Sequence, residues 1–221
     1  MISSSKPISV ALFASGRGSN LEAILTNIGQ GKLDARVMVV ISNLSSAGAL
    51  EIARQHKILA IHLSQKQFPN EAEFTENMLT TLKSFQIELI VLAGYLKKMP
   101  IKIIQAYKHR IINIHPALLP SFGGAGLYGH YVHEAVLSYG CKVSGATVHL
   151  VDEEYDSGAP ILQKCVPVLN DDTPDVLAAR VLRVEHEILP RAIQLFAEHR
   201  IIVQNRLVRI KESKSNNTSA T

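Results

Sequence analysis

Short apolar runs rich in β-branched residues alternate with segments of helical periodicity along the first half of this chain. The expected strands are residues 8–14, 36–41, 58–63, 89–93 and 110–114, and the expected helices are residues 20–28, 47–56, 71–85 and 101–107. Strands that alternate with helices form a parallel sheet, because the helices carry the crossover connections. The first, second and fourth runs contain continuous apolar stretches, which indicates burial on both faces. This order predicts the α/β class, with a mostly parallel sheet flanked by helices.

The pattern changes after residue 114. A glycine-rich stretch precedes an expected helix near His130–Ser138, and two apparent strands follow at Lys142–Val151 and Ile161–Val168. We expect these strands to pair antiparallel. A long helix is expected at about Pro174–Glu198. Pro190 is expected to bend or split it, because proline removes a backbone donor and clashes with the preceding turn.

Basic residues are concentrated at the end of the chain. The formal net charge is +4 and the isoelectric point is about 9.1, which would favour a nucleic-acid surface if the charge lay on one face. Residues 206–221 account for +3 of that charge, and they are polar without periodicity from residue 211. We therefore expect one domain over residues 1–205, a basic, disordered tail over residues 206–221, and no nucleic-acid partner.

Cysteine usage and the absence of long apolar segments bear on the compartment. Cys141 and Cys165 are too few for a disulfide framework and do not form a C-x-x-C pair, which favours a reducing compartment. The start of the chain has no apolar signal core, and no segment reaches about 18 uninterrupted apolar residues. We expect a cytoplasmic protein without a membrane span.

A glycine-rich turn, Ser15-Gly16-Arg17-Gly18-Ser19-Asn20-Leu21, follows the first expected strand. Backbone N–H groups at such a strand-to-helix turn face anions, and the helix dipole favours negative charge there. Ser19 and Glu22 have the spacing of a capping box. The dinucleotide fingerprint requires a glycine where Leu21 stands, and no acidic residue follows the second strand to bind a ribose. The turn therefore favours a monophosphate ligand, with an ordinary tight turn as the alternative.

Five of the nine histidines lie between positions 109 and 149, which suggests a site. Asn113 and His115 lie two residues apart in an expected strand, so both point to the same side of the sheet at its carboxyl edge. Open α/β sheets bind ligands at that edge. Asn113 can donate to an oxyanion, and His115 can donate to it or carry a proton near neutral pH. The acidic run at residues 152–158 supplies carboxylates that could hold the His115 imidazole protonated.

These patterns also have structural interpretations. His130 and His133 could bind zinc together with His115, but no cysteine or third spaced ligand completes the motif, and we expect no metal. The acidic run could be a solvated turn. A non-catalytic nucleotide-binding module, in which the polar residues merely support turns, is the alternative from a different class.

Four segments occur in a fixed order: Ser-Gly-Arg-Gly-Ser-Asn-Leu at 15–21, Leu-Ala-Gly-Tyr at 92–95, Asn-Ile-His-Pro-Ala-Leu-Leu-Pro at 113–120 and Thr-Val-His-Leu-Val-Asp-Glu-Glu-Tyr-Asp-Ser-Gly at 147–158. Together they closely resemble the phosphoribosylglycinamide formyltransferase family, and the similarity runs from about Ile8 to Arg200. The resemblance implies a Rossmann-like fold. It also implies transfer of the formyl group of 10-formyltetrahydrofolate to the amine of 5-phosphoribosylglycinamide, in purine biosynthesis and without a metal.

The resemblance implies roles for individual residues. Gly18, Ser19 and Asn20 match the family's loop that binds the substrate phosphate. Glu185 matches a glutamate that contacts the substrate. The segment that binds the folate pterin matches Leu96, Lys97, Lys98 and Met99, with Asn113 also at the folate. The catalytic trio matches Asn113, His115 and Asp156. In that family's reaction the amine attacks the formyl carbon. Asn113 and a protonated His115 would donate to the oxyanion, and Asp156 would raise the His115 pKa.

Two regions depart from the family pattern. The loop Ser121–Gly129 is longer and richer in glycine than the familiar form. No arginine matches the one that contacts the glutamate tail of folate, for which Lys66 or Lys97 could serve.

Other folate-dependent formyltransferases, acting on a sugar-nucleotide amine or on methionyl-tRNA, share the Asn-x-His and Asp pattern, as does formyltetrahydrofolate hydrolase. The tRNA enzyme and the hydrolase are expected to carry an additional domain, for which 221 residues leave no room. The phosphate loop favours a small phosphorylated amine as substrate. We expect a monomer or homodimer that acts on small molecules.

Overall fold

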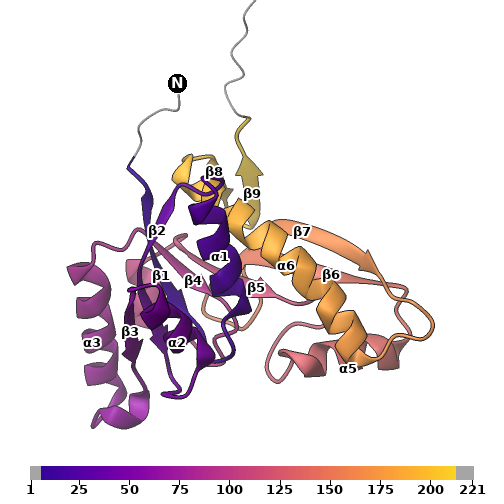
Figure 1. Ribbon diagram of the computed structural model, residues 1–221, viewed down its shortest axis with the longest axis horizontal. Coiled ribbons are helices and arrows are strands. Elements are labelled where there is room, and N and C mark those ends of the chain that lie inside the picture. The colour runs from indigo at the N-terminus through magenta and orange to yellow at the C-terminus, as the bar shows by residue number, and fades with distance from the viewer. Residues whose placement is uncertain (1–5, 213–221) are drawn as a thin grey trace, which may run out of the picture.

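A seven-stranded sheet organises the protein in the computed structural model, which describes residues 6–212. Its strands lie in the order β3-β2-β1-β4-β5-β6-β7 (Figure 1). Their bounds are β1 Ile8–Phe13, β2 Ala35–Ser42, β3 Leu59–His62, β4 Leu89–Leu92, β5 Ile111–His115, β6 Val143–Leu150 and β7 Pro160–Pro167. Neighbours from β3 to β5 pair parallel, and β5, β6 and β7 pair antiparallel. The predicted α/β class with an antiparallel C-terminal portion is confirmed.

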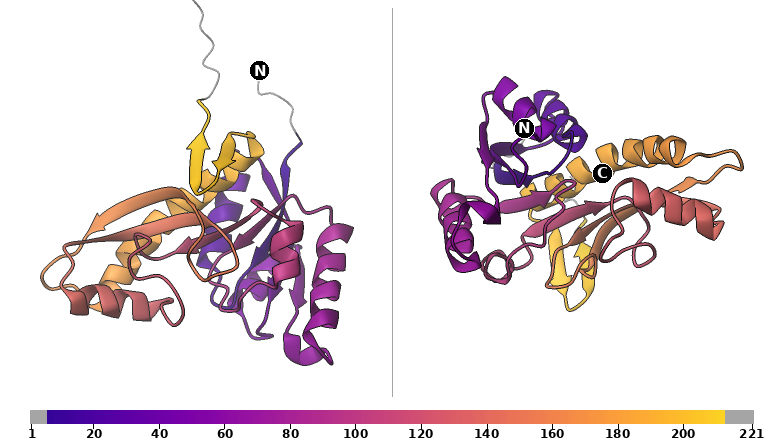
Figure 2. Two further views of the ribbon diagram at one scale, coloured as in Figure 1. Left: turned by 180° about the vertical axis from the view of Figure 1, so that it is seen from behind. Right: turned by 90° about the horizontal axis from the view of Figure 1, so that it is seen from below.

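Helices pack against the sheet (Figure 2), and they do so through two separate apolar clusters. The helices are α1 Ser19–Gly29, α2 Gly48–Gln55, α3 Glu71–Ser84, α4 Ile101–Ala106, α5 His130–Tyr139 and α6 Pro174–Ala197, with a 3-10 turn, η1, at Gln65–Gln67. Residues of α1, α2, α5 and α6 share one cluster, and residues of α3 and α4 share the other. Consecutive residues of β1 point to opposite faces of the sheet. Leu12 belongs to the cluster of α1, α2, α5 and α6, and Phe13 belongs to the cluster of α3 and α4. Strands β1 and β4 are therefore buried on both faces, as their apolar runs predicted, whereas β3 at the edge of the sheet has no buried residue.

Helix α6 is one continuous element of 24 residues, so of the two expected effects of Pro190, bending or splitting, the split does not occur. Pro190 is buried beside Leu189 and Ala192, on the apolar face that packs against the sheet. This packing holds the helix together although one backbone hydrogen bond is missing. The helix begins where the Thr173 side chain accepts a hydrogen bond from the backbone N–H of Val176.

A two-stranded hairpin follows α6. Its strands are β8 Ile201–Gln204 and β9 Leu207–Ile210, and they pair antiparallel. The predicted boundary between the domain and its tail, at residues 205 and 206, falls in the turn of this hairpin. Residues 207–210 therefore belong to a folded element, whereas residues 213–221 of the predicted tail lie outside the described residues.

The strand order places three loops at one edge of the sheet. Strand β1 lies between β2 and β4, so the connections from β1 and β4 leave the sheet in opposite directions. Such a reversal opens a crevice at the carboxyl ends of the strands. The turn after β1, the loop after β4 and the end of β5 all lie at this edge.

Candidate active site

A cavity of about 890 Å³ opens at the carboxyl edge of the sheet. Its walls come from the loops after β1 and β4, the end of β5, the glycine-rich loop before α5, and the loop between β6 and β7. Cavities of this size are typical of small-molecule sites. Asn113, His115 and Asp156 line it together with the segment Leu96–Met99. The structure therefore brings the predicted catalytic trio and the predicted folate-binding segment to one cavity.

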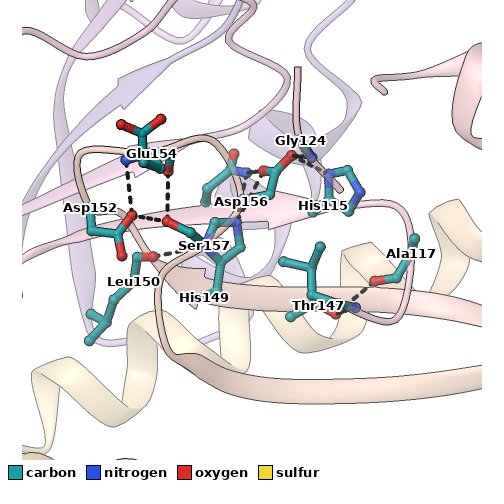
Figure 3. Close-up of polar contacts among 12 residues, drawn as sticks. His115, Ala117, Gly124, Thr147, His149, Leu150, Asp152, Glu154, Asp156 and Ser157 are labelled. Atoms are coloured by element: carbon teal, nitrogen blue, oxygen red, sulfur yellow. Dashed lines mark hydrogen bonds and ion pairs between the residues drawn. The ribbon is translucent and has the colours of Figure 1, made fainter. Parts of the chain in front are cut away.

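The side chains of the trio are in contact. His115 Nδ1 lies 3.5 Å from Asp156 Oδ2 (Figure 3). Asn113 Nδ2 lies 3.4 Å from Asp156 Oδ1. Asn113 and His115 reach the same carboxylate because they are two residues apart in β5 and share a side of the sheet. Asp156 comes from the loop between β6 and β7.

His149 is a fourth member of this group, to which sequence reasoning gave no role. Its Nδ1 donates to the Leu150 carbonyl oxygen over 2.7 Å (Figure 3), because a carbonyl only accepts hydrogen bonds. Its Nε2 lies 3.0 Å from Asn113 Nδ2 and 3.5 Å from Asp156 Oδ1. His149 is buried and therefore holds the Asn113 amide in a fixed orientation. The signal that could have found it is the cross-strand pairing of His149 with Asn113.

The His115 ring lies between two oxygen atoms. Its Nε2 is 2.8 Å from the Phe122 carbonyl oxygen, and its Nδ1 faces the Asp156 carboxylate. Since the carbonyl only accepts, Nε2 carries the proton of the neutral ring and Nδ1 is the atom that can gain one. His115 is therefore built to take up a proton beside a carboxylate.

The pKa of His115 is nevertheless lowered from 6.5. Burial lowers it most, while the charge of Asp156 and the bond to the Phe122 carbonyl raise it, and His149 lowers it. Asp156 does raise the pKa as expected, but the loss of hydration around the ring outweighs that effect. Burial therefore opposes the protonated ring that we expected at His115.

Asp156 has a left-handed backbone, with φ of 53°, which Asp and Asn adopt more readily than most residues. Its Oδ2 accepts a hydrogen bond of 2.9 Å from the Gly124 N–H (Figure 3). Burial raises the pKa of Asp156, but the neighbouring His149, His115 and Gly124 N–H lower it below 3.8 overall. The carboxylate is therefore ionised at neutral pH, and it ties the glycine-rich loop to the catalytic trio.

The segment Leu96–Met99 forms the wall of the cavity opposite the loop between β6 and β7. The Leu96 N–H donates to Ser15 Oγ over 2.9 Å, which joins this wall to the turn after β1. Lys98 Nζ reaches across to Glu154 Oε2 at 3.7 Å. Of the two lysines proposed for the folate tail, Lys97 lines the cavity, whereas Lys66 lies in η1 and does not.

The turn after β1 leads directly into α1. Gly18 caps this helix with φ of 93°, and no side chain caps it. The capping box predicted from Ser19 and Glu22 is therefore wrong, because Ser19 already lies inside the helix. The first N–H groups of α1 have no intrahelical carbonyl to bind. These N–H groups are the donors that a phosphate would use.

Asn20 and Glu185 form a buried pair between α1 and α6. Asn20 Nδ2 donates to Glu185 Oε2 over 2.8 Å, and burial raises the pKa of Glu185 although this bond lowers it. Asn20 Oδ1 has no hydrogen-bond partner among residues 6–212. The cavity described above is lined by Ser15 and Gly16 from the same turn, and not by Gly18–Asn20 or Glu185. The residues predicted to bind the ribonucleotide, Gly18–Asn20 and Glu185, therefore lie outside the cavity lining. They are connected to it by Ser15 and Gly16 of the same turn.

The histidines considered as zinc ligands have other neighbours. His130 Nε2 lies 3.2 Å from Glu134 Oε1, and its Nδ1 lies 3.4 Å from Asp175 Oδ1. Burial, with the charges of His130 and His115, lowers the pKa of His133 to about 4. Within the part of the chain that the structure describes, no three His, Cys, Asp or Glu residues are grouped so as to hold a metal ion.

No helix among residues 6–212 is long and apolar enough to cross a membrane.

Comparison with known proteins matches residues 8–193 to the family model described as formyl transferase. The chain is 39% identical over 207 residues to a chloroplastic phosphoribosylglycinamide formyltransferase of Vigna unguiculata, covering 94% of this chain and 66% of the relative. It is 35% identical to the phosphoribosylglycinamide formyltransferase of Haemophilus influenzae, covering 90% of this chain and 91% of that protein.

Solved structures agree with these matches. Glycinamide ribonucleotide transformylase 1 from Symbiobacterium toebii superposes with a TM-score of 0.89 at 38% identity, covering 96% of this chain and 98% of that chain. The chain spans about two thirds of the length of the Vigna relative, and 18% of the human trifunctional purine biosynthetic protein that it also matches. The match to the family model and to full-length bacterial relatives is sufficient to assign the family.

Proposed function

Because the chain belongs to the formyl transferase family, we propose that it is a phosphoribosylglycinamide formyltransferase, which transfers a formyl group from 10-formyltetrahydrofolate to the amine of 5-phosphoribosylglycinamide in purine biosynthesis. The observation that carries this proposal is the convergence of Asn113, His115 and Asp156 on the cavity that Leu96–Met99 also line. The formyl donor is consumed in each turnover and is therefore a second substrate.

Asn113 stabilises the negative charge that develops on the formyl oxygen. One N–H of its amide is directed to His149 Nε2 at 3.0 Å. The other contact, to Asp156 Oδ1, is long at 3.4 Å, so this N–H is available for the oxyanion. Because His149 fixes the amide in advance, little reorganisation is needed when the charge forms.

His115 moves the proton. When the substrate amine attacks the formyl carbon, its nitrogen forms a bond to that carbon and loses one proton. His115 Nδ1 takes up this proton, and the imidazolium is then flanked by the Asp156 carboxylate and the Phe122 carbonyl oxygen. The proton is delivered to N10 of the folate as the bond from N10 to the formyl carbon breaks. The amine thus loses one hydrogen and N10 gains one.

The ribonucleotide is held at the start of α1. The N–H groups of Gly18, Ser19 and Asn20 bind the phosphate, as their position at a helix N-terminus favours. Asn20 Oδ1 has no donor within the described part of the chain, and Glu185 offers carboxyl oxygens beside it. Two neighbouring acceptors suit the hydroxyl groups of a ribose. On the other side, Leu96–Met99 hold the folate pterin with their backbone.

A glycine substitution tests the phosphate loop. A Cβ at Gly18 would lie 2.8 Å from the Cα of Ala49, and the left-handed φ would add strain. Gly18→Ala is therefore expected to displace the loop and to raise the KM for the ribonucleotide by about tenfold, with less effect on kcat. Gly29→Ala is the matched control, because Gly29 is exposed at the end of α1, lies outside the cavity, and a Cβ there meets nothing within 4 Å. Steady-state kinetics of both variants measure the KM for the ribonucleotide and the kcat. An unchanged KM in Gly18→Ala would move the phosphate elsewhere.

Comparison of two acceptors tests the substrate class. Glycinamide ribonucleotide should react with a kcat/KM at least about 100-fold higher than the same riboside without its phosphate, because the N–H groups of α1 are then left without their anion. Equal rates for the two acceptors would contradict a phosphate-dependent enzyme. They would favour one of the related formyltransferases that act on a different amine.

The compartment and assembly state belong to the same proposal. Cys141 and Cys165 are free thiols, which supports a reducing compartment, and we place the enzyme in the cytoplasm. We also propose that the enzyme is a monomer or a homodimer that acts on small molecules.

A further inference from the structure

The hairpin β8–β9 lies after the segment that matches the family model, which ends at residue 193. Arg206 stands in its turn, and Arg206 Nη2 donates a hydrogen bond of 2.8 Å to the Ser157 carbonyl oxygen. Ser157 is the residue next to Asp156. An element at the end of the chain therefore touches the backbone of the loop that carries a proposed catalytic residue.

The loop between β6 and β7 is braced from within (Figure 3). Ser157 Oγ donates to Asp152 Oδ1 and to the Glu154 carbonyl oxygen, and the Glu154 N–H donates to Asp152 Oδ1. These contacts join the members of the loop to one another. The bond from Arg206 reaches the loop from a separate part of the fold, as do the Gly124 N–H at Asp156 Oδ2 and Lys98 at Glu154.

The hairpin is itself anchored at its base. Arg200 Nε donates to the Lys211 carbonyl oxygen over 2.7 Å, and Arg200 Nη1 lies 2.8 Å from Glu198 Oε2 at the end of α6. The strands β8 and β9 pair over their four residues each. Because Lys211 at the end of the hairpin is bonded to Arg200, whose own N–H donates to Leu195 of α6, the turn holds Arg206 in a defined place.

We propose that Arg206 is a positioning residue that holds the Ser157 peptide, and through it the Asp156 carboxylate, beside His115. Asp156 depends on its backbone for this placement, because its left-handed φ of 53° directs the side chain toward β5. Without Arg206 the Ser157–Gly158 peptide loses its hydrogen bond to the hairpin, and the distance of 3.5 Å between the carboxylate and His115 Nδ1 is less firmly fixed. The inference rests on the proposed function for its effect on turnover.

Three variants of the full chain test this role. Arg206→Ala is expected to lower kcat by about 5- to 10-fold with an unchanged KM for the ribonucleotide, the size expected when one hydrogen bond is lost. Arg206→Lys keeps a donor and should recover most of the rate. Arg209→Ala is the matched control, because it removes the same charge from β9 of the same hairpin and leaves the bond to Ser157 in place.

A titration separates positioning from general destabilisation. The charge of Asp156 raises the His115 pKa, so a displaced carboxylate should let that pKa fall further in Arg206→Ala and leave it unchanged in Arg209→Ala. Histidine-selective NMR, well below the melting temperature, reads this directly. Unchanged His115 titration in a folded Arg206→Ala protein would overturn the inference, as would an equal loss of kcat in Arg209→Ala. If the wild-type protein proves inactive, the proposed function fails, and the titration still decides the role of Arg206.

Discussion

His115→Ala is expected to lower kcat for formyl transfer by about 100- to 1000-fold, with little change in the KM for either substrate. The imidazole is the group placed to take the amine proton, and its Nδ1 is 3.5 Å from a carboxylate that stabilises the charged ring. The phosphate and pterin sites are formed by other residues, so binding is expected to remain. Steady-state kinetics with saturating folate measure both quantities.

The pH dependence of the wild-type enzyme follows from the same residue. Burial holds the pKa of His115 below 6.5, so the ring stays neutral as the pH falls through that value. At lower pH the ring becomes protonated and can no longer accept the amine proton. The acid limb of kcat/KM against pH should therefore lie below 6.5, and it should disappear in His115→Ala. His56→Ala, which removes an exposed imidazole at the end of α2, should behave as wild type. A kcat near that of wild type in His115→Ala would show that another group moves the proton.

Asp156→Asn is expected to lower kcat by about 100-fold or more. Asparagine fits the left-handed backbone at this position, so the loop should keep its shape while the charge is lost. Without that charge the His115 pKa should fall further below 6.5, because Asp156 is the largest influence that raises it. The acid limb should then move to lower pH while the rate falls. Kinetics against pH, together with a histidine titration by NMR, measure both effects.

Glu153→Gln is the matched control for this variant. Glu153 is exposed in the same loop, and its substitution removes one negative charge without touching His115. It should retain the wild-type kcat and pH profile. Comparable losses in Asp156→Asn and Glu153→Gln would show that the net charge of the loop, rather than the Asp156 carboxylate, is what matters.

Periodicity was sufficient to predict most of the fold and the common direction of Asn113 and His115 in the candidate site. The apolar runs located β1, β2 and β4 because those strands are buried on both faces. The alternation of Asn113 and His115 predicted their common direction, since a period of two is a local property of a strand. The resemblance to a family then added Asp156 to Asn113 and His115, although it lies 41 positions after His115.

The features that sequence could not provide depend on distant contacts. His149 meets Asn113 only through the antiparallel register of β5 and β6, which no local pattern specifies. Phe122 contributes a backbone carbonyl, and every residue has one. The His115 pKa depends on whether burial or the Asp156 charge prevails, and the extent of burial comes from packing. Pro190 is likewise accommodated by the packing of α6.

One turnover measurement tests the central claim most directly. The protein is incubated with 10-formyltetrahydrofolate and glycinamide ribonucleotide together, and with each of them alone, while the release of tetrahydrofolate is followed. The proposed transferase predicts release only when both are present, with formylated ribonucleotide formed in equal amount. Release from the folate without the amine would instead indicate a hydrolase, and no release under any condition would indicate a non-catalytic binding module. Either of these two results would contradict the assignment of Asn113, His115 and Asp156 to formyl transfer.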